Sequence, residues 1–148
     1  MNKIELQNIF LKTFTEQNAI DYCQINNINP EDITELYLND NELTDISGVK
    51  PFKNLIILTL HKNYITDISC LKDLKNLNIL SLSDNQITDI SVLKDLNKLK
   101  QLNIDNLQLD SNQFKYIKNL KNLEDLVCEY GFKDIKVLKQ LNSNIKLW

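Results

Sequence analysis

Three nearly identical phrases decide the fold of this chain: "NELTDIS" at residues 41–47, "NYITDIS" at 63–69 and "NQITDIS" at 85–91. The second and third phrases each begin 22 residues after the one before. Copies at a fixed interval of roughly 20 to 50 residues are typical of repeat proteins, in which each copy is one structural unit. The sequence therefore predicts a stack of similar units rather than a fold arranged around one catalytic residue.

The apolar residues of one unit change their spacing from two to three. Leu58 and Leu60 are two residues apart, which places their side chains on the same face of a short strand. After the phrase, apolar residues recur at every third position, at Ile65, Ile68, Leu71 and Leu74. This second spacing is typical of 3₁₀ or irregular turns. One unit therefore makes a strand, a corner and a return leg, and only stacked neighbours bury its apolar side.

The polar residues of the phrase fit the corner between the strand and the return leg. Asn41, Asn63 and Asn85 follow the strands, and asparagine both tolerates left-handed backbone geometry and bonds to nearby backbone groups. The Thr-Asp-x-Ser segment that follows supplies oxygen atoms for the backbone N–H groups that open the return leg. We therefore interpret the phrase as structural.

This pattern resembles the leucine-rich repeat family, in the 22-residue class found in internalins and in a phosphatase-regulating leucine-rich repeat protein. The resemblance covers residues 33–98 most closely. It implies an α/β solenoid, a right-handed superhelix with a concave parallel β-sheet and a 3₁₀ or irregular convex side. It also implies a protein-binding role, although the repeat residues themselves carry no activity.

The repeat frame changes after residue 98. Leu107 stands where the corner asparagine belongs, and the next apolar residues, from Phe114 onward, arrive two positions late. An insertion around "DSNQ" at residues 110–113 is therefore expected to convert the return leg into a helical turn. In the last full unit Gly131 takes the corner, where glycine can supply a positive φ. Ile145 and Trp148 fit the first two strand slots of an incomplete unit, as expected for a terminal repeat.

The first 32 residues do not fit the frame and predict a helical N-terminal cap. Ile4, Ile9, Phe10 and Phe14, followed by "IDYCQINNI", predict one or two amphipathic helical segments packed against the first repeat. Pro30, which is followed by two acidic residues, marks the start of the first strand. The expected organisation is one domain, with the cap at residues 1–32 and five repeats plus a truncated strand at residues 33–148.

Composition supports a single globular domain. The chain has 148 residues, a formal charge of −3, 43% hydrophobic residues and 25% charged residues. No window approaches the roughly 18 unbroken apolar residues of a membrane span. Polar residues also interrupt the segment where a signal peptide would have its apolar stretch, namely Glu5, Gln7, Asn8 and Lys12. We expect a cytoplasmic protein that does not bind membranes, with secretion without a cleaved signal left open.

Catalytic and metal-binding chemistry is not predicted. The three cysteines lack CxxC spacing and a neighbouring histidine, so we expect reduced, partly buried thiols at Cys23, Cys70 and Cys128. His61 is the single histidine, and no spacing points to a nucleophile partner, so we expect a protein without enzymatic activity. A calcium site along Asp84, Asp105 and Asp125 is disfavoured because no loop supplies further ligands. No cofactor and no small-molecule substrate are expected.

The residues between the inward-facing leucines are expected on the concave face. Carboxylates prevail among them and Lys62 is the single lysine, whereas the return legs carry many lysines. Those lysines alternate with aspartates and lack aromatic neighbours, so nucleic acid is not an expected partner. We predict that a protein partner contacts Glu35, Tyr37, Asp40, Ile57, Thr59, His61, Ile79, Ser81, Asp84, Asn103, Asp105, Asp125, Val127, Glu129 and Tyr130.

A concave acidic surface attracts a basic partner and speeds its association. The preferred hypothesis is a small bacterial inhibitor of the immunity type, which neutralises a basic partner such as a nuclease toxin by occlusion. One alternative is an exported internalin-like adaptor or virulence ligand that binds a host protein. A phosphatase-regulatory subunit is a further alternative that rests on fold analogy alone. An ordinary solvated strand surface with no partner also remains compatible with these residues.

Overall fold

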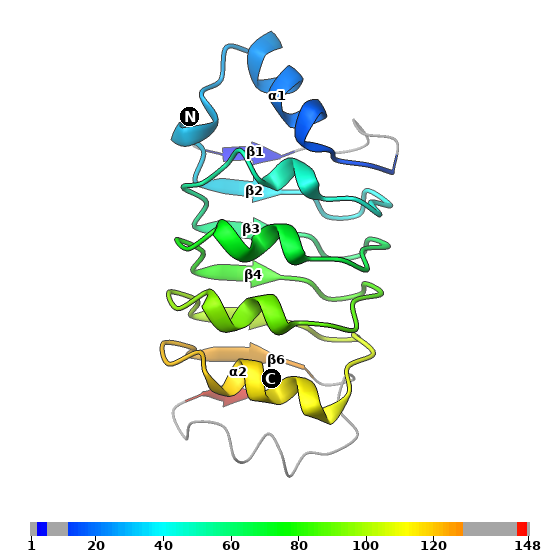
Figure 1. The fold of residues 1–148 in the computed structure, drawn as a ribbon, viewed down its shortest axis with the longest axis vertical. Helices are drawn as coiled ribbons and strands as arrows, with labels where there is room; N and C mark the ends of the chain where they lie inside the picture. The colour runs from blue at the N-terminus through cyan, green and yellow to red at the C-terminus, as the bar shows by residue number, and fades with distance from the viewer. Residues whose placement is uncertain (1–2, 6–11, 129–144, 148) are drawn as a thin grey trace.

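The computed structural model describes residues 3–5, 12–128 and 145–147. These residues form a solenoid in which the strands lie in chain order in one parallel sheet (Figure 1). The seven strands are β1 (Lys3–Glu5), β2 (Glu35–Tyr37), β3 (Ile57–Thr59), β4 (Ile79–Ser81), β5 (Gln101–Asn103), β6 (Asp125–Val127) and β7 (Lys146–Leu147). The α/β solenoid predicted from the repeat is therefore confirmed.

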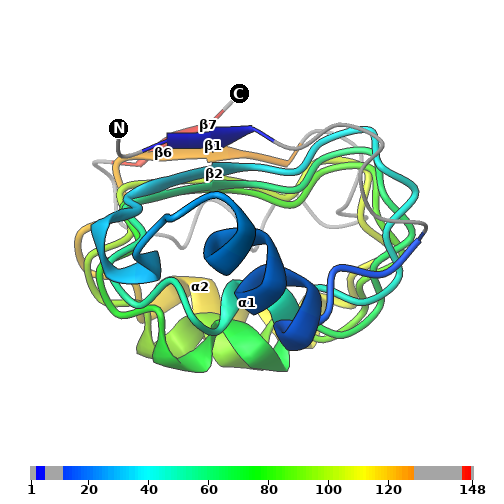
Figure 2. The same cartoon turned by 90° about the horizontal axis from the view of Figure 1, so that it is seen from above.

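The return legs lie opposite the sheet and are mostly 3₁₀ helices, as the three-residue spacing predicted (Figure 2). The short helices are η1 (Pro30–Asp32), η2 (Ser47–Val49), η3 (Ser69–Asp73), η4 (Ser91–Asp95) and η5 (Ser111–Gln113). The leucines of the strands and of the return legs meet in one continuous core between the two sides. Burial is nearly complete, since Leu58 and Leu71 are both 0% exposed.

The corner asparagines bridge neighbouring units through their buried amides. The Oδ1 of Asn63 accepts from the backbone N–H of Asn41 at 3.1 Å and of Leu43 at 2.9 Å. Its Nδ2 donates to the backbone carbonyls of Leu38 and Leu60, both at 2.9 Å. One side chain therefore satisfies backbone groups of two consecutive units, which an apolar core otherwise leaves without partners.

The left-handed backbone conformation lies one residue before each corner asparagine. Asp40, Lys62, Asp84 and Asn106 have φ values of 54° to 55°. The corner asparagines therefore do not adopt the left-handed conformation that their residue type tolerates, and their hydrogen-bonding role is confirmed. The aspartates of the phrase act as predicted. Asp67, for example, accepts from the backbone N–H of Ser69 at 2.7 Å, and the other two units repeat this bond.

Helix α1 (Glu16–Ile25) covers the first repeat, where the sequence predicts a helical cap (Figures 1 and 2). A capping box joins Thr15 and Asn18 at its start. The segment before the helix packs closely on η2, because the N–H of Gly48 donates to the carbonyl of Phe14 at 2.6 Å. A Cβ at position 48 would lie 2.7 Å from the backbone oxygens of Phe14 and Thr15, so this packing requires glycine.

Both ends of the sheet differ from the sequence-based expectation. Ile4 lies in strand β1, which pairs with β2, and not in a helix. Ile9 and Phe10 lie outside the described residues, as does the part of the last full unit from residue 129 onward, which includes Gly131. At the other end, Leu147 and not Trp148 occupies the slot opposite Leu126, so the truncated strand is shifted by one residue. The return leg that contains the insertion is helical, as predicted, because the insertion forms η5 and is followed directly by α2 (Phe114–Lys118).

Candidate functional site

The sheet register arranges the outward side chains of the strands in two columns. We call this surface, together with the residues just after the strands, the concave face. The first column is Lys3, Glu35, Ile57, Ile79, Gln101, Asp125 and Lys146, and the second is Glu5, Tyr37, Thr59, Ser81, Asn103 and Val127. Nine of the predicted contact residues are thus neighbours in these columns. Glu129 and Tyr130 lie outside the described residues.

Strands β1 and β7 add three charged residues that the sequence interpretation missed: Lys3, Glu5 and Lys146. Lys62 is therefore not the single lysine of this surface. The signal in β1 was a three-residue alternation in which Ile4 is buried between two exposed residues. Alternation over only three residues does not distinguish a strand from a helix or a loop.

The charges at the β1 end of the concave face compensate one another. The Nζ of Lys3 lies 3.4 Å from a carboxylate oxygen of Glu5 and 4.4 Å from the ring centroid of Tyr37. The Tyr37 hydroxyl donates to Glu35 at 3.0 Å. Burial, followed by the hydrogen bond and the charge of Glu35, raises the pKa of Tyr37. This end therefore presents a mixed surface, not a strongly acidic one.

The face is hollowed over β4, β5 and β6, where predicted contact residues with apolar side chains lie beside a carboxylate. The hollow has a volume of about 430 Å³, and its walls include Ile79, Asn103, Asp125 and Val127. Asp125 accepts from the side-chain amide of Gln101 at 3.3 Å. This arrangement places apolar side chains beside a carboxylate, which suits the aliphatic stem and charged head of a lysine or arginine.

Asp105 adds negative charge just beyond β5, where its backbone N–H donates to the Oδ1 of Asn103, a lining residue of the hollow, at 3.0 Å. Burial, with the charge of Asp105 as a further cause, raises the pKa of Cys128 to about 11. Cys70 has a pKa of about 12, mainly because of burial. Such thiols stay protonated near neutral pH, which makes them poor nucleophiles. The expectation of free and at least partly buried cysteines is confirmed.

Asp40 and Asp84 lie at the corner rim and not beside the strand residues with which they were grouped. Their positive φ turns them away from the alternation of the strand, and they line a separate hollow of about 400 Å³. There the carboxylate of Asp40 lies 4.0 Å from Lys62 and 3.8 Å from His61. Asp84 accepts from the side-chain amide of Asn106 at 2.7 Å, a bond that leaves its negative charge in place.

No metal-type cluster of three or more His, Cys, Asp and Glu residues is found among residues 3–5, 12–128 and 145–147. Within the same ranges, no helix has the length and hydrophobicity needed to cross a bilayer. The concave face offers shape, apolar contacts and charge, which are the properties of a binding surface.

Comparison with known proteins agrees with this architecture. The leucine rich repeat family pattern matches residues 31–87. No curated protein matches the sequence. A solved internalin, inlF of Listeria monocytogenes strain 4b F2365, is 34% identical over 79% of this chain, with a TM-score of 0.72. The chain spans only 34% of that internalin.

A second solved structure, internalin C2 (inlC2) of the same strain, shares the fold at 23% identity. The match covers 99% of this chain and 80% of that protein, with a TM-score of 0.64. The repeat, the parallel sheet and these likenesses lead to one conclusion. The chain contains leucine-rich repeats and has the solenoid fold of these two internalins.

Proposed function

We propose that this chain binds a basic protein through the β4–β6 part of its concave face. The observation that carries the proposal is the hollow between Ile79 and Val127, which has Asp125 in its wall; Asp105 is bonded through its backbone N–H to the lining residue Asn103. A basic side chain in this hollow would bury its aliphatic carbons against the apolar walls and direct its charge to the carboxylates.

The charge distribution supports association from this side. Asp125 lines this hollow, Asp105 follows β5 and Asp84 lines the separate hollow at the rim, while the lysine of β1 is paired with Glu5. Negative potential focused in a hollow attracts a positively charged partner and raises the association rate. Apolar anchors at the centre of such a surface then lower the dissociation rate by excluding water.

Occlusion is the activity that we assign to this binding. A solenoid that covers the basic surface of a nuclease or a similar protein prevents that surface from reaching its own polyanionic ligand. In this version the chain is a small cytoplasmic inhibitor of the immunity type. The support is the acidic hollow, and the proposal predicts a partner that is itself basic.

A second candidate function is a ligand of the internalin kind that acts outside the cell. The observation that favours it is the 34% identity to a solved internalin over 79% of this chain. Cell fractionation distinguishes the two candidates. Detection of the protein in the culture medium or on the cell surface supports the second, and its retention in the cytoplasm supports the inhibitor.

Affinity capture from the native organism tests the binding proposal. The tagged wild type is compared with Asp84→Lys/Asp105→Lys/Asp125→Lys, and we expect a basic partner that the triple variant loses. The matched control is Asp73→Lys/Asp95→Lys/Asp110→Lys, which makes the same charge change at exposed positions on the return legs. Capture that survives the first variant, or is lost equally in the control, would refute binding through this face.

A further inference from the structure

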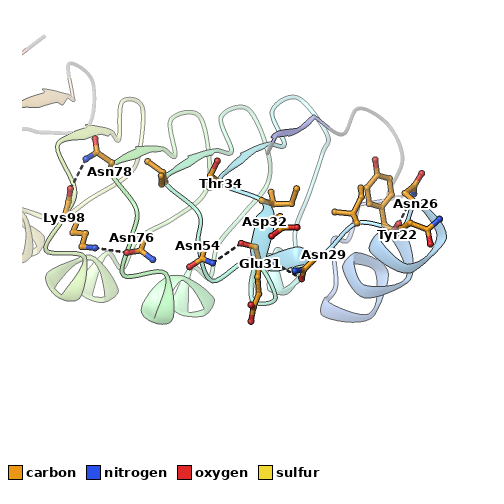
Figure 3. Close-up of a pocket in the computed structure, with 14 residues that line it drawn as sticks. Tyr22, Asn26, Asn29, Glu31, Asp32, Thr34, Asn54, Asn76, Asn78 and Lys98 are labelled. Carbon is orange, nitrogen blue, oxygen red and sulfur yellow. Dashed lines mark hydrogen bonds between the residues drawn. The ribbon is translucent and has the colours of Figure 1, made fainter. Parts of the chain in front are cut away.

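A larger hollow lies on a different edge of the solenoid, along the turns that precede the strands (Figure 3). It has a volume of about 1110 Å³ and runs from the end of α1 to Lys98, across several repeats. No residue lines both this groove and the concave face, so binding here is independent of the proposed function. We call it the asparagine groove.

Amide side chains line the middle of the groove, and in each of them one of the two polar atoms of the amide group makes a hydrogen bond. The Nδ2 of Asn54 donates to the carbonyl of Glu31 at 2.9 Å, and the Oδ1 of Asn76 accepts from the Nζ of Lys98 at 2.8 Å (Figure 3). The Nδ2 of Asn78 donates to the carbonyl of Lys98 at 3.4 Å.

The opposite ends of these three amides, which belong to residues that line the groove, have no hydrogen-bond partner in the described part of the chain. They are the Oδ1 atoms of Asn54 and Asn78 and the Nδ2 of Asn76. Fixed acceptors and a fixed donor in a row match the alternating N–H and C=O groups of an extended polypeptide. Because the side chains are already oriented, little conformational entropy is lost on binding.

The charges of the groove are opposite at its two ends. Glu31 and Asp32 are exposed near α1, and neither forms an ion pair with a residue in the described ranges. The C-terminal end of α1 also lies here, carries partial negative charge from its carbonyls and has no basic residue in its last turn. Lys98 marks the other end. The α1 end therefore favours a cationic group.

Apolar residues at the groove are aliphatic. Ile56 lines it and is 44% exposed, and Ile28 lines it beside the end of α1. Ile25, immediately before the groove residue Asn26, is 79% exposed. Exposed aliphatic side chains accept apolar side chains of a peptide, whereas sugars stack on aromatic faces. Tyr22 is the single aromatic side chain among the lining residues.

We propose that the asparagine groove binds an extended segment of a protein partner, with a lysine or arginine of that segment at the α1 end. Strands of one sheet are about 4.8 Å apart, so the three repeat intervals from Asp32 to Lys98 span about 14 Å, or about four extended residues. The volume of the groove exceeds the roughly 300 to 1,000 Å³ of ordinary small-molecule sites. A short linear peptide fits both dimensions.

A displayed library of random heptapeptides, selected on the immobilised full chain, tests this proposal. We expect enriched peptides to contain lysine or arginine. A synthetic, fluorescently labelled member is then titrated against the wild type and three variants by anisotropy. Glu31→Gln/Asp32→Asn removes charge without changing shape and should weaken binding at least tenfold at low salt. Asn76→Leu should weaken it several-fold, and Asp105→Asn/Asp125→Asn should leave it unchanged.

The unfolding midpoints of the variants establish that each is folded before its affinity is interpreted. The absence of enrichment over an unrelated protein would overturn the proposal. So would enriched peptides that bind Glu31→Gln/Asp32→Asn as tightly as the wild type, or that lose binding only in the concave-face variant. Binding of neutral oligosaccharides that Asn76→Leu abolishes, with no peptide enriched, would assign the groove to a glycan instead.

Discussion

The first three repeats and the repeat that begins at Leu99 differ in how each unit is hydrogen-bonded to the one before it. In the regular units, a buried asparagine joins each corner to the next, as Asn85 does by accepting from the N–H of Ile65 at 3.0 Å. In the later unit the equivalent residue is Leu107, which has no side-chain acceptor for Ile87. Both corners nevertheless have the same backbone, since Asp84 and Asn106 have φ values of 54° and 55°.

The difference teaches that the corner conformation does not depend on the asparagine. The later unit instead bonds to its neighbour through its insertion, where the Oε1 of Gln113 accepts from the N–H of Ile90 at 3.0 Å. Leu107 is 0% exposed and contributes apolar contact where the other units have an amide. The asparagines therefore serve to satisfy buried backbone groups between units, and substitutions in the two regions separate this role from corner geometry.

The largest effect is expected for Asn85→Ala. This change removes the acceptor of the Ile65 N–H and the donor to the carbonyls of Leu60, Leu82 and Ser83. Because these backbone groups are buried and lose their partner, we expect the free energy of unfolding to fall by about 3 kcal/mol. Urea unfolding followed by circular dichroism measures it.

The matched control is Asn76→Ala, which changes an asparagine in the turn before β4 and should cost less than about 0.5 kcal/mol. Hydrogen exchange at the Ile65 amide locates the effect, since only Asn85→Ala should accelerate it. Equal stability losses in the two variants would show that the buried amides contribute nothing beyond ordinary surface asparagines.

Leu107→Asn places a corner asparagine, as found in the regular units, into the irregular unit. Because the backbone already has the corner conformation, the new amide should accept from the N–H of Ile87 and donate to nearby carbonyls. We expect a loss of only about 1 kcal/mol, against about 3 kcal/mol for Leu107→Ala, which leaves a cavity. Urea unfolding of both variants makes the comparison, and a larger loss for asparagine than for alanine would contradict it.

The fold was predictable because every slot of the repeat has one physical requirement. Leucines two residues apart share one face of a strand, so their spacing predicts a strand. The aspartate before each return leg accepts from a backbone N–H, so it predicts where the return leg begins. The two terminal strands were harder to predict from the sequence. The three residues of β1 are too few to establish a period, and the register of β7 depends on its contact with β6 and not on a spacing within the chain.

The binding surfaces were predictable only in part, for a related reason. Alternation along a strand places Ile79 and Val127 on one face, and the register confirms that placement. The positive φ at Asp40 interrupts the alternation, so its side chain lies at the rim instead. The asparagine groove depends on where α1 docks against the turns, and the sequence of neither part specifies that docking by itself.

Gln113→Ala tests whether the insertion replaces the asparagine bridge. The change removes the acceptor for the Ile90 N–H and should destabilise the chain by about 1 kcal/mol. Gln113→Glu keeps an oxygen at the same position and should recover most of the loss. Thermal unfolding and hydrogen exchange at Ile90 measure both. If alanine and glutamate are equally stable, the bridge has no energetic role.

The last comparison concerns the aspartates at the start of the return legs. Asp89, two residues before η4, accepts from the N–H of Ser91 at 2.8 Å, whereas Asp110, directly before η5, makes no side-chain cap bond. Asp89→Ala should therefore cost about 1 kcal/mol, as for the loss of a helix cap. Asp110→Ala should cost less than about 0.5 kcal/mol, as for an ordinary surface change. Asp89→Asn retains an acceptor oxygen, so urea unfolding should place it near the wild type. If Asp110→Ala lowers the free energy of unfolding as much as Asp89→Ala does, the irregular unit depends on its aspartate in some way other than capping. The two regions would then differ less than their hydrogen bonds indicate.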